Sequence, residues 1–91
     1  MTSRQVKWII PDGGDPDRRI DAIGGDNFCD HLDDAIFNIK AGLHRYWTVV
    51  NGRAAEVQVA RRLSGREYLK TSADSYEPNN LLALPHRRWA A

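Results

Sequence analysis

Hydrophobic and polar residues alternate along "QVKWII" (residues 5–10) and again along "RRIDAI" (residues 18–23). A period of two is typical of a half-buried β-strand. The residues between them, "PDGGDPD", combine glycine, proline and aspartate, which are the residues that form turns. The pattern therefore predicts two strands joined by a hairpin loop, with the second strand ending at Gly24.

Apolar residues of the next segment recur every three or four positions, at Leu32, Ala35, Ile36, Ile39 and Leu43. This spacing predicts an amphipathic helix over roughly residues 30–41. Asp30 is expected to cap its N-terminus and Gly42 its C-terminus. Asp33 and Asp34 place negative charge in the first turn, where the helix dipole stabilises it.

Two runs rich in β-formers flank Asn51-Gly52, the preferred pair for a two-residue type I′ turn. Such a turn fixes the register, so that Val50 lies opposite Arg53 and Thr48 opposite Ala55. One face of this hairpin then carries Tyr46, Thr48, Val50, Ala55, Val57 and Val59, and we expect it to face the core. The other face carries Trp47, Val49, Ala54, Glu56 and Gln58.

A further strand, "REYLKT", follows a turn at Ser64-Gly65. The element order β-β-α-β-β-β predicts an α+β fold, an antiparallel sheet of about five strands with one helix packed on one face. Because one helix covers one face only, the other face must be solvated or bind something. We expect a single domain over residues 1–91, with residues 86–91 as a flexible C-terminal tail.

The segment "SADSYEPNN" precedes the apolar stretch "LLALP" near the end of the chain. The side chains of Asp74, Asn79 and Asn80 are expected to bond to nearby backbone and hold a structural turn. The leucines of "LLALP", at positions 81, 82 and 84, would then return to cap an open end of the core.

The composition, 42% hydrophobic and 27% charged, is ordinary for a globular protein. No apolar run approaches the roughly 18 residues that cross a membrane. The first residues, "MTSRQVKWII", have too short an apolar core for a signal peptide. We therefore expect a cytoplasmic protein with no membrane partner.

Charge is uneven although the formal net charge is only +1. Residues 1–34 hold eight acidic and four basic residues, and residues 35–91 hold four acidic and nine basic ones. The basic half could bind nucleic acid. The simpler interpretation is that the two halves attract each other within the fold.

Candidate ligands for a metal are Cys29, His31, His44 and His86. Structural zinc usually needs two pairs of ligands, and only Cys29 and His31 form a local pair. We therefore predict no metal and no cofactor. A hydrolytic site built from Tyr68, Asp74 and His86 is a further hypothesis, although no nucleophile motif accompanies these residues.

Several blocks together resemble the DUF3892 family of small bacterial proteins of unknown function. They are "RIDAIGG", "DDAIFNIKAG", "YWTVVNGRAAEVQVA" and "EYLKTSADSYEPNNLLALP", within residues 19–85. The chain differs from the family pattern at Phe28-Cys29, where members often have tryptophan. It differs again at His86-Arg87, where members often have an acidic residue and cysteine. The resemblance implies a fold and no mechanism.

Together these observations favour a small non-catalytic module that binds another protein, or a second copy of itself as a homodimer, through an exposed sheet face. Nucleic-acid binding through a basic strip on the C-terminal strands is the alternative, and an uncharacterised hydrolase is the third hypothesis. The residues expected to contact the partner are Trp47, Glu56, Gln58, Arg61, Arg66 and Lys70.

Overall fold

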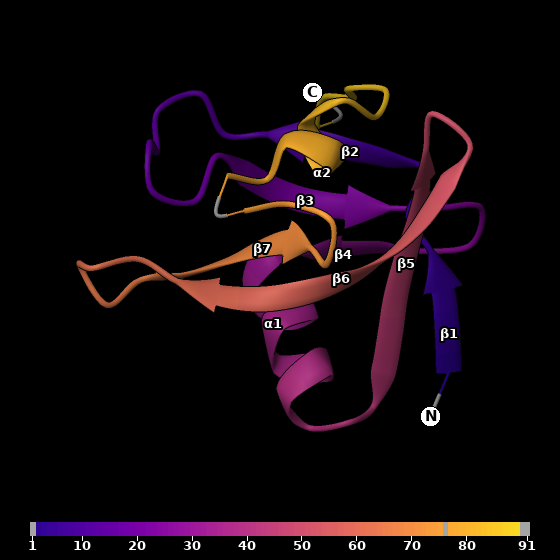
Figure 1. The fold of residues 1–91 in the computed structure, drawn as a ribbon, viewed down its shortest axis with the longest axis horizontal. Helices are drawn as coiled ribbons and strands as arrows, with labels where there is room; N and C mark the ends of the chain where they lie inside the picture. The colour runs from indigo at the N-terminus through magenta and orange to yellow at the C-terminus, as the bar shows by residue number, and fades with distance from the viewer. Residues whose placement is uncertain (1, 76, 90–91) are drawn as a thin grey trace.

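Two facing sheets and two helices make up the fold in a computed structural model, which describes residues 2–75 and 77–89 (Figure 1). The elements of this part of the chain are β1 (Thr2–Gln5), β2 (Trp8–Pro11), β3 (Ile20–Gly24), β4 (Cys29–His31), α1 (Leu32–Lys40), β5 (His44–Val50), β6 (Arg53–Arg61), β7 (Glu67–Thr71) and α2 (Asn79–Leu82). One sheet has the order β1-β5-β6-β7 and the other β2-β3-β4. The pairing of β1 with β5 is parallel, and the other strand pairs are antiparallel.

The predicted α+β class, with a mostly antiparallel arrangement and one main helix, is confirmed. The strands are more numerous than expected, and they form two sheets instead of one. Strands β1 and β4 were not predicted, because "TSRQ" and "CDH" are short and lack alternating apolar residues.

The alternating segment at residues 5–10 changes sheets instead of forming one strand. The Val6 N–H donates to the Trp47 carbonyl at 2.7 Å, in the four-stranded sheet. The next residue, Lys7, donates its N–H to the Gly24 carbonyl at 2.8 Å, in the three-stranded sheet. Alternation continues through this crossing, so the pattern alone gives no sign of it. The predicted antiparallel pairing that follows is present between β2 and β3.

The hairpin of β5 and β6 has the predicted turn and register. Asn51 and Gly52 both have positive φ, 53° and 76°, as a type I′ turn requires. Val50 lies opposite Arg53 and Thr48 opposite Ala55, which confirms the predicted pairs.

Helix α1 begins at Leu32, so the prediction that Asp30 caps it is wrong. Asp30 belongs to β4, and its carboxylate accepts a hydrogen bond from the Tyr46 hydroxyl at 2.5 Å. The C-terminal prediction is confirmed, because Gly42 has a φ of 73°. The Leu43 N–H donates to Asn38 O and the Gly42 N–H to Ile39 O, which closes the helix in a Schellman motif.

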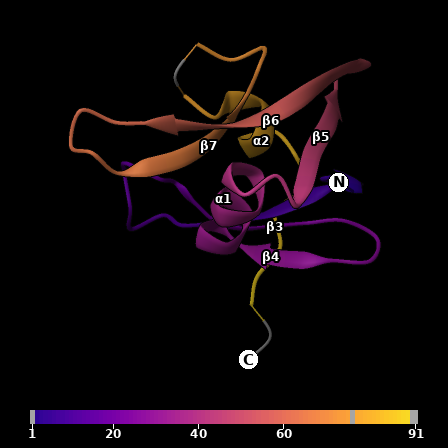
Figure 2. The same cartoon turned by 90° about the horizontal axis from the view of Figure 1, so that it is seen from below.

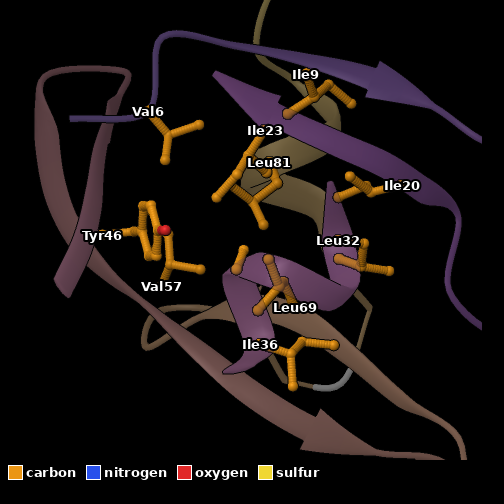
Figure 3. Close-up of a cluster of buried hydrophobic side chains, with 11 residues drawn as sticks. Val6, Ile9, Ile20, Ile23, Leu32, Ile36, Tyr46, Val57, Leu69 and Leu81 are labelled. Carbon is orange, nitrogen blue, oxygen red and sulfur yellow. The ribbon is translucent and has the colours of Figure 1, made fainter. Parts of the chain in front are cut away.

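The core lies between the two sheets (Figure 3). Its members come from both sheets, from the β1–β2 crossing and from both helices: Val6, Ile9, Ile20, Ile23, Leu32, Ala35, Ile36, Tyr46, Val57, Leu69 and Leu81. Leu81 is fully buried, and Leu82 and Leu84 pack against the same cluster. This confirms that "LLALP" returns to cap the core.

The first residues of the predicted tail, His86 and Arg87, lie against β2. The Ile9 N–H donates to the Pro85 carbonyl at 3.0 Å, and the Arg87 N–H donates to the Ile9 carbonyl at 2.8 Å. The Trp89 indole stacks on His31, with ring centroids 4.6 Å apart. Ala90 and Ala91 lie outside the described residues. Neither helix in the described chain has the length and apolar character to cross a membrane.

Candidate binding surface on the outer sheet face

The four-stranded sheet has one face in the core and one face turned outward. Alternation along the hairpin gives the inner face Tyr46, Thr48 and Val57, which are buried. The Thr48 hydroxyl donates to the Val6 carbonyl at 2.9 Å, so even the polar member of this face is satisfied internally. Figure 2 shows α1 and the three-stranded sheet on this inner side.

We define the outer face as the opposite side of β5 and β6. It carries Arg45, Trp47, Val49, Ala54, Glu56 and Gln58, each exposed or half-buried. Trp47 is half-buried and lies opposite Glu56 in the register. Glu56 forms an ion pair with Arg45 at 3.2 Å, and Val49 keeps 39% of its surface exposed. The outer face therefore combines accessible apolar area with a charged pair.

Four of the six residues predicted to contact a partner share this side of the sheet. Trp47, Glu56 and Gln58 lie on the outer face, and Lys70 lies opposite Gln58 on β7. The Lys70 ammonium donates to the Asp74 carbonyl at 3.3 Å.

The remaining two predicted residues lie elsewhere. Arg61 is the last residue of β6 and alternates to the inner side, where its guanidinium is 3.8 Å from the Glu67 carboxylate. Arg66 lies in the β6–β7 turn, and its guanidinium pairs with Asp15 at 2.8 Å. Neither belongs to a surface with Trp47.

The outer side of the sheet is covered where it reaches β7. Tyr68 alternates to this side but is buried, with the Arg62 guanidinium 4.1 Å from the centre of its ring. Arg62 donates two hydrogen bonds to the Glu77 carboxylate, at 3.0 and 3.3 Å. The accessible part of the sheet is therefore confined to its β5 and β6 side. The role of Arg62 was missed, because nothing local in the sequence links positions 62 and 77.

Three arginines of the basic strip, at positions 61, 62 and 66, form ion pairs within the molecule. The hydrogen bond from Arg62 lowers the pKa of Glu77 below its ordinary value, and Arg19 adds to the effect. The hydrogen bond from Lys40 likewise lowers the pKa of Glu67. The pairs of Arg66 with Asp15 and Asp17 join the basic half of the chain to the acidic half, in the direction that the simpler interpretation of the uneven charge expects.

A second polar cluster lies behind the inner face at Tyr46. Its hydroxyl donates to Asp30 at 2.5 Å and accepts from the Asn38 amide at 3.0 Å. Arg4 pairs with the same Asp30 carboxylate at 3.1 Å. Burial, aided by the hydrogen bond to Asp30, raises the pKa of Tyr46 to about 12. The cluster joins β1, β4, α1 and β5, and its neutral phenol is a structural hydrogen-bond partner.

Asp74 organises the turn after β7. Its carboxylate accepts from the Thr71 N–H and hydroxyl, both at 3.1 Å, and from the Asn80 N–H at 3.3 Å. The Asn80 amide also donates to the Thr71 hydroxyl at 2.9 Å. Asn79 begins α2. Because the oxygens of Asp74 accept these bonds, the carboxylate is positioned to hold backbone.

The residues of the hydrolase and metal hypotheses are dispersed. His86 contacts the Leu82 carbonyl through Nε2 at 2.8 Å, and no hydrogen bond or ion pair joins it to Asp74 in the described chain. Cys29 and His31 are in β4, and His44 is in β5. Burial and the charge of Asp30 raise the pKa of the Cys29 thiol. Within residues 2–75 and 77–89, no three histidine, cysteine, aspartate or glutamate side chains form a group suited to a metal ion.

Comparison with known families gives one match, which covers residues 6–85 and is described as a protein of unknown function, DUF3892. The chain belongs to the DUF3892 family. The match includes every strand except β1, together with both helices. No curated protein and no solved structure is significantly similar to the chain. The description of DUF3892 names no activity.

Proposed function

We propose that this DUF3892 domain is a non-catalytic protein-binding module whose contact surface is the outer face. The observation that carries the proposal is the asymmetry of the sheet. Its inner face is buried in the core. Trp47 and Val49 lie on the other side, beside the ion pair of Arg45 and Glu56. Aromatic area with a polar rim is typical of protein interfaces.

The partner is another protein or a second copy of this chain. The indole of Trp47 is half-buried in its own sheet, so it loses little freedom when a partner covers it. Truncating such an anchor typically costs more than about 1 kcal/mol of binding free energy, while rim positions cost less.

Site-specific crosslinking in the native cell tests this proposal. A photoreactive amino acid replaces Val49 on the outer face, and a matched control replaces Asp34 on the exposed side of α1. We expect a discrete crosslinked species from position 49 that is absent from position 34 and is weakened by Trp47→Ala. A crosslinked species with the mass of two chains would identify the partner as a second copy. Sedimentation velocity should then show a dimer in solution. Equal crosslinking from both positions, with a strict monomer in solution, would show the proposal to be wrong.

Nucleic-acid binding is the second candidate and has weaker support. Three arginines of the basic strip, at positions 61, 62 and 66, pair with carboxylates of the same chain. Binding to phosphates would have to compete with these pairs. It also predicts an affinity that falls steeply with added salt. Retention on single-stranded DNA or RNA at low salt, lost at moderate salt, would favour this candidate over the outer face.

A further inference from the structure

We propose that the free edge of β6 accepts an extended peptide strand from another protein. Strands β5 and β6 pair from Trp47 to Val50 and from Arg53 to Glu56. Beyond Glu56, β6 continues to Arg61 paired only with β7, while β5 pairs with β1 on its far side. Figure 1 shows the two strands diverging, with α1 visible in the angle between them. In the described chain, this stretch of β6 therefore has a neighbouring strand on one side only.

Hydrogen bonds at the two ends of the β6–β7 pair show which backbone groups face the free edge. The Arg62 N–H donates to Arg66 O, and the Ser72 N–H donates to Glu56 O. Even-numbered residues of β6 thus bond toward β7, and in an antiparallel ladder the alternate residues point the other way. Val59 and Arg61 therefore direct their N–H and C=O groups outward. Such a row of backbone groups is a template for an added strand.

A groove with a mixed apolar and charged lining follows this edge over α1. Two adjoining clefts, of about 400 and about 490 Å³, share Lys40 in their linings. The first is also lined by Ile39, His44, Val57 and Val59, and by the polar side chains of Arg45, Glu56 and Gln58. The second is also lined by Ile36, Phe37 and Ala41, and by the carboxylates of Asp33 and Glu67. Phe37 is 63% exposed, because the sheet ends before it covers this side of the helix. A strand paired with β6 would place every second side chain over this surface.

The charges beside the groove favour a peptide that carries a carboxylate. Lys40 and Arg61 both approach the single carboxylate of Glu67, at 2.9 and 3.8 Å. Asp33 also lines the second cleft and pairs with Arg18. The three cations and two carboxylates of this cluster therefore leave one positive charge without a matching negative charge. The ligand class is an extended segment whose alternate side chains face α1 and are apolar, except for one carboxylate beside Lys40 and Arg61.

Geometry favours a peptide over a second copy at this edge. Two copies related by a two-fold axis would pair their β6 strands antiparallel. The β6–β7 turn of the partner would then enter the narrow end of the angle, where Trp47 and Glu56 are still paired. A single strand without an attached sheet meets no such obstacle. The groove adjoins the outer face, because Arg45, Glu56 and Gln58 also line its first cleft. The inference nevertheless rests on the backbone edge at Val59 and Arg61, and its test reads those amides and not Trp47 or Val49.

Amide hydrogen exchange by NMR tests the inference directly. The probe is a synthetic eight-residue peptide in which valine alternates with threonine and one valine is replaced by glutamate, added at about 1 mM to detect weak affinity. A scrambled peptide without alternation is the control. We expect exchange of the Val59 and Arg61 amides to slow by about tenfold or more with the alternating peptide only. A version with lysine for glutamate should bind several-fold more weakly.

Two protein variants provide the matched comparison. Phe37→Ser removes apolar area from the groove and should weaken peptide binding about fivefold or more, by the apolar area lost. Leu63→Ser removes a fully exposed apolar side chain in the β6–β7 turn, outside the groove, and should leave binding unchanged. Unchanged exchange at Val59 and Arg61 with the alternating peptide would overturn the inference. Protection of both amides in the concentrated free protein, lost on dilution, would assign the edge to a second copy and also overturn it.

Discussion

Replacing Leu81 by alanine tests whether the short helix α2 closes the core. Leu81 has no exposed surface and packs among core residues of both sheets and α1 (Figure 3). Removing three buried carbon atoms costs about 2.4 kcal/mol in transfer free energy. The cavity left behind raises the cost of a buried leucine-to-alanine change to about 2.7–5 kcal/mol. This is a large fraction of the roughly 5–10 kcal/mol that stabilises a domain of this size.

The matched control is Leu63→Ala, because Leu63 is fully exposed in the β6–β7 turn. It should change the free energy of unfolding by less than about 0.5 kcal/mol. Urea unfolding followed by tryptophan fluorescence measures both variants, and thermal unfolding should show a Tm lowered by about 12–24 °C for a loss of about 3 kcal/mol at position 81. If Leu81→Ala does not fold, Leu81→Met should fold with a loss of less than about 1.5 kcal/mol. A Leu81→Ala variant as stable as Leu63→Ala would refute the role of α2 in the core.

Three further predictions concern packing and ionisation. Gly25→Ala places a Cβ 2.4 Å from the backbone oxygen of Gln5 and should destabilise the fold by about 1–3 kcal/mol. Gly13→Ala is the control, because its Cβ would have no atom within 4 Å. Equal urea midpoints for the two variants would contradict this prediction. Because burial raises the pKa of Tyr46 to about 12 from 10.0, the contribution of Tyr46 to the free energy of unfolding should be constant below pH 10 and be lost as pH rises from 10 to 12. Tyr46→Phe should flatten this fall. The lowered pKa of Glu77 should make stability fall as pH drops through 4.5 and below, less steeply in Glu77→Gln; parallel curves of Tm against pH would count against its ion pairs.

Features that depend on neighbouring residues were predictable from the sequence. The Asn51-Gly52 turn fixes the register of its hairpin, because both residues readily adopt positive φ. Gly42 ends α1 for the same local reason. The register also predicts that Trp47 and Glu56 lie on one side of the sheet, and they do.

Features that depend on distant residues were not predictable. Asp30 is a residue type that often caps helices and lies just before α1. Its carboxylate instead accepts a hydrogen bond from the Tyr46 hydroxyl, on a strand sixteen residues away. The chain crosses between sheets at Val6 because Trp47 O and Gly24 O lie on either side of it, and an alternating pattern continues through that crossing unchanged.

The residues expected to contact a partner also include some whose position was predictable from the sequence and some whose position was not. Arg61 could have been excluded from the outer face by parity along β6, because its position is odd and Gln58 is even. Arg66 could not have been excluded, because its ion-pair partner Asp15 lies in a loop 51 residues earlier in the sequence. The groove beside β6 was also out of reach, since nothing local reveals where β5 and β6 separate.

The strand pairings made near the two ends of the described chain determine how the domain unfolds. β1 joins β5 across more than forty residues, and the stretch at Pro85 joins β2 from the opposite end of the sequence. The central hairpins can form from local contacts, but both sheets are completed only when these remote segments return. Limited proteolysis near either end should therefore unravel the whole domain in one cooperative step, with no trimmed and stable remainder.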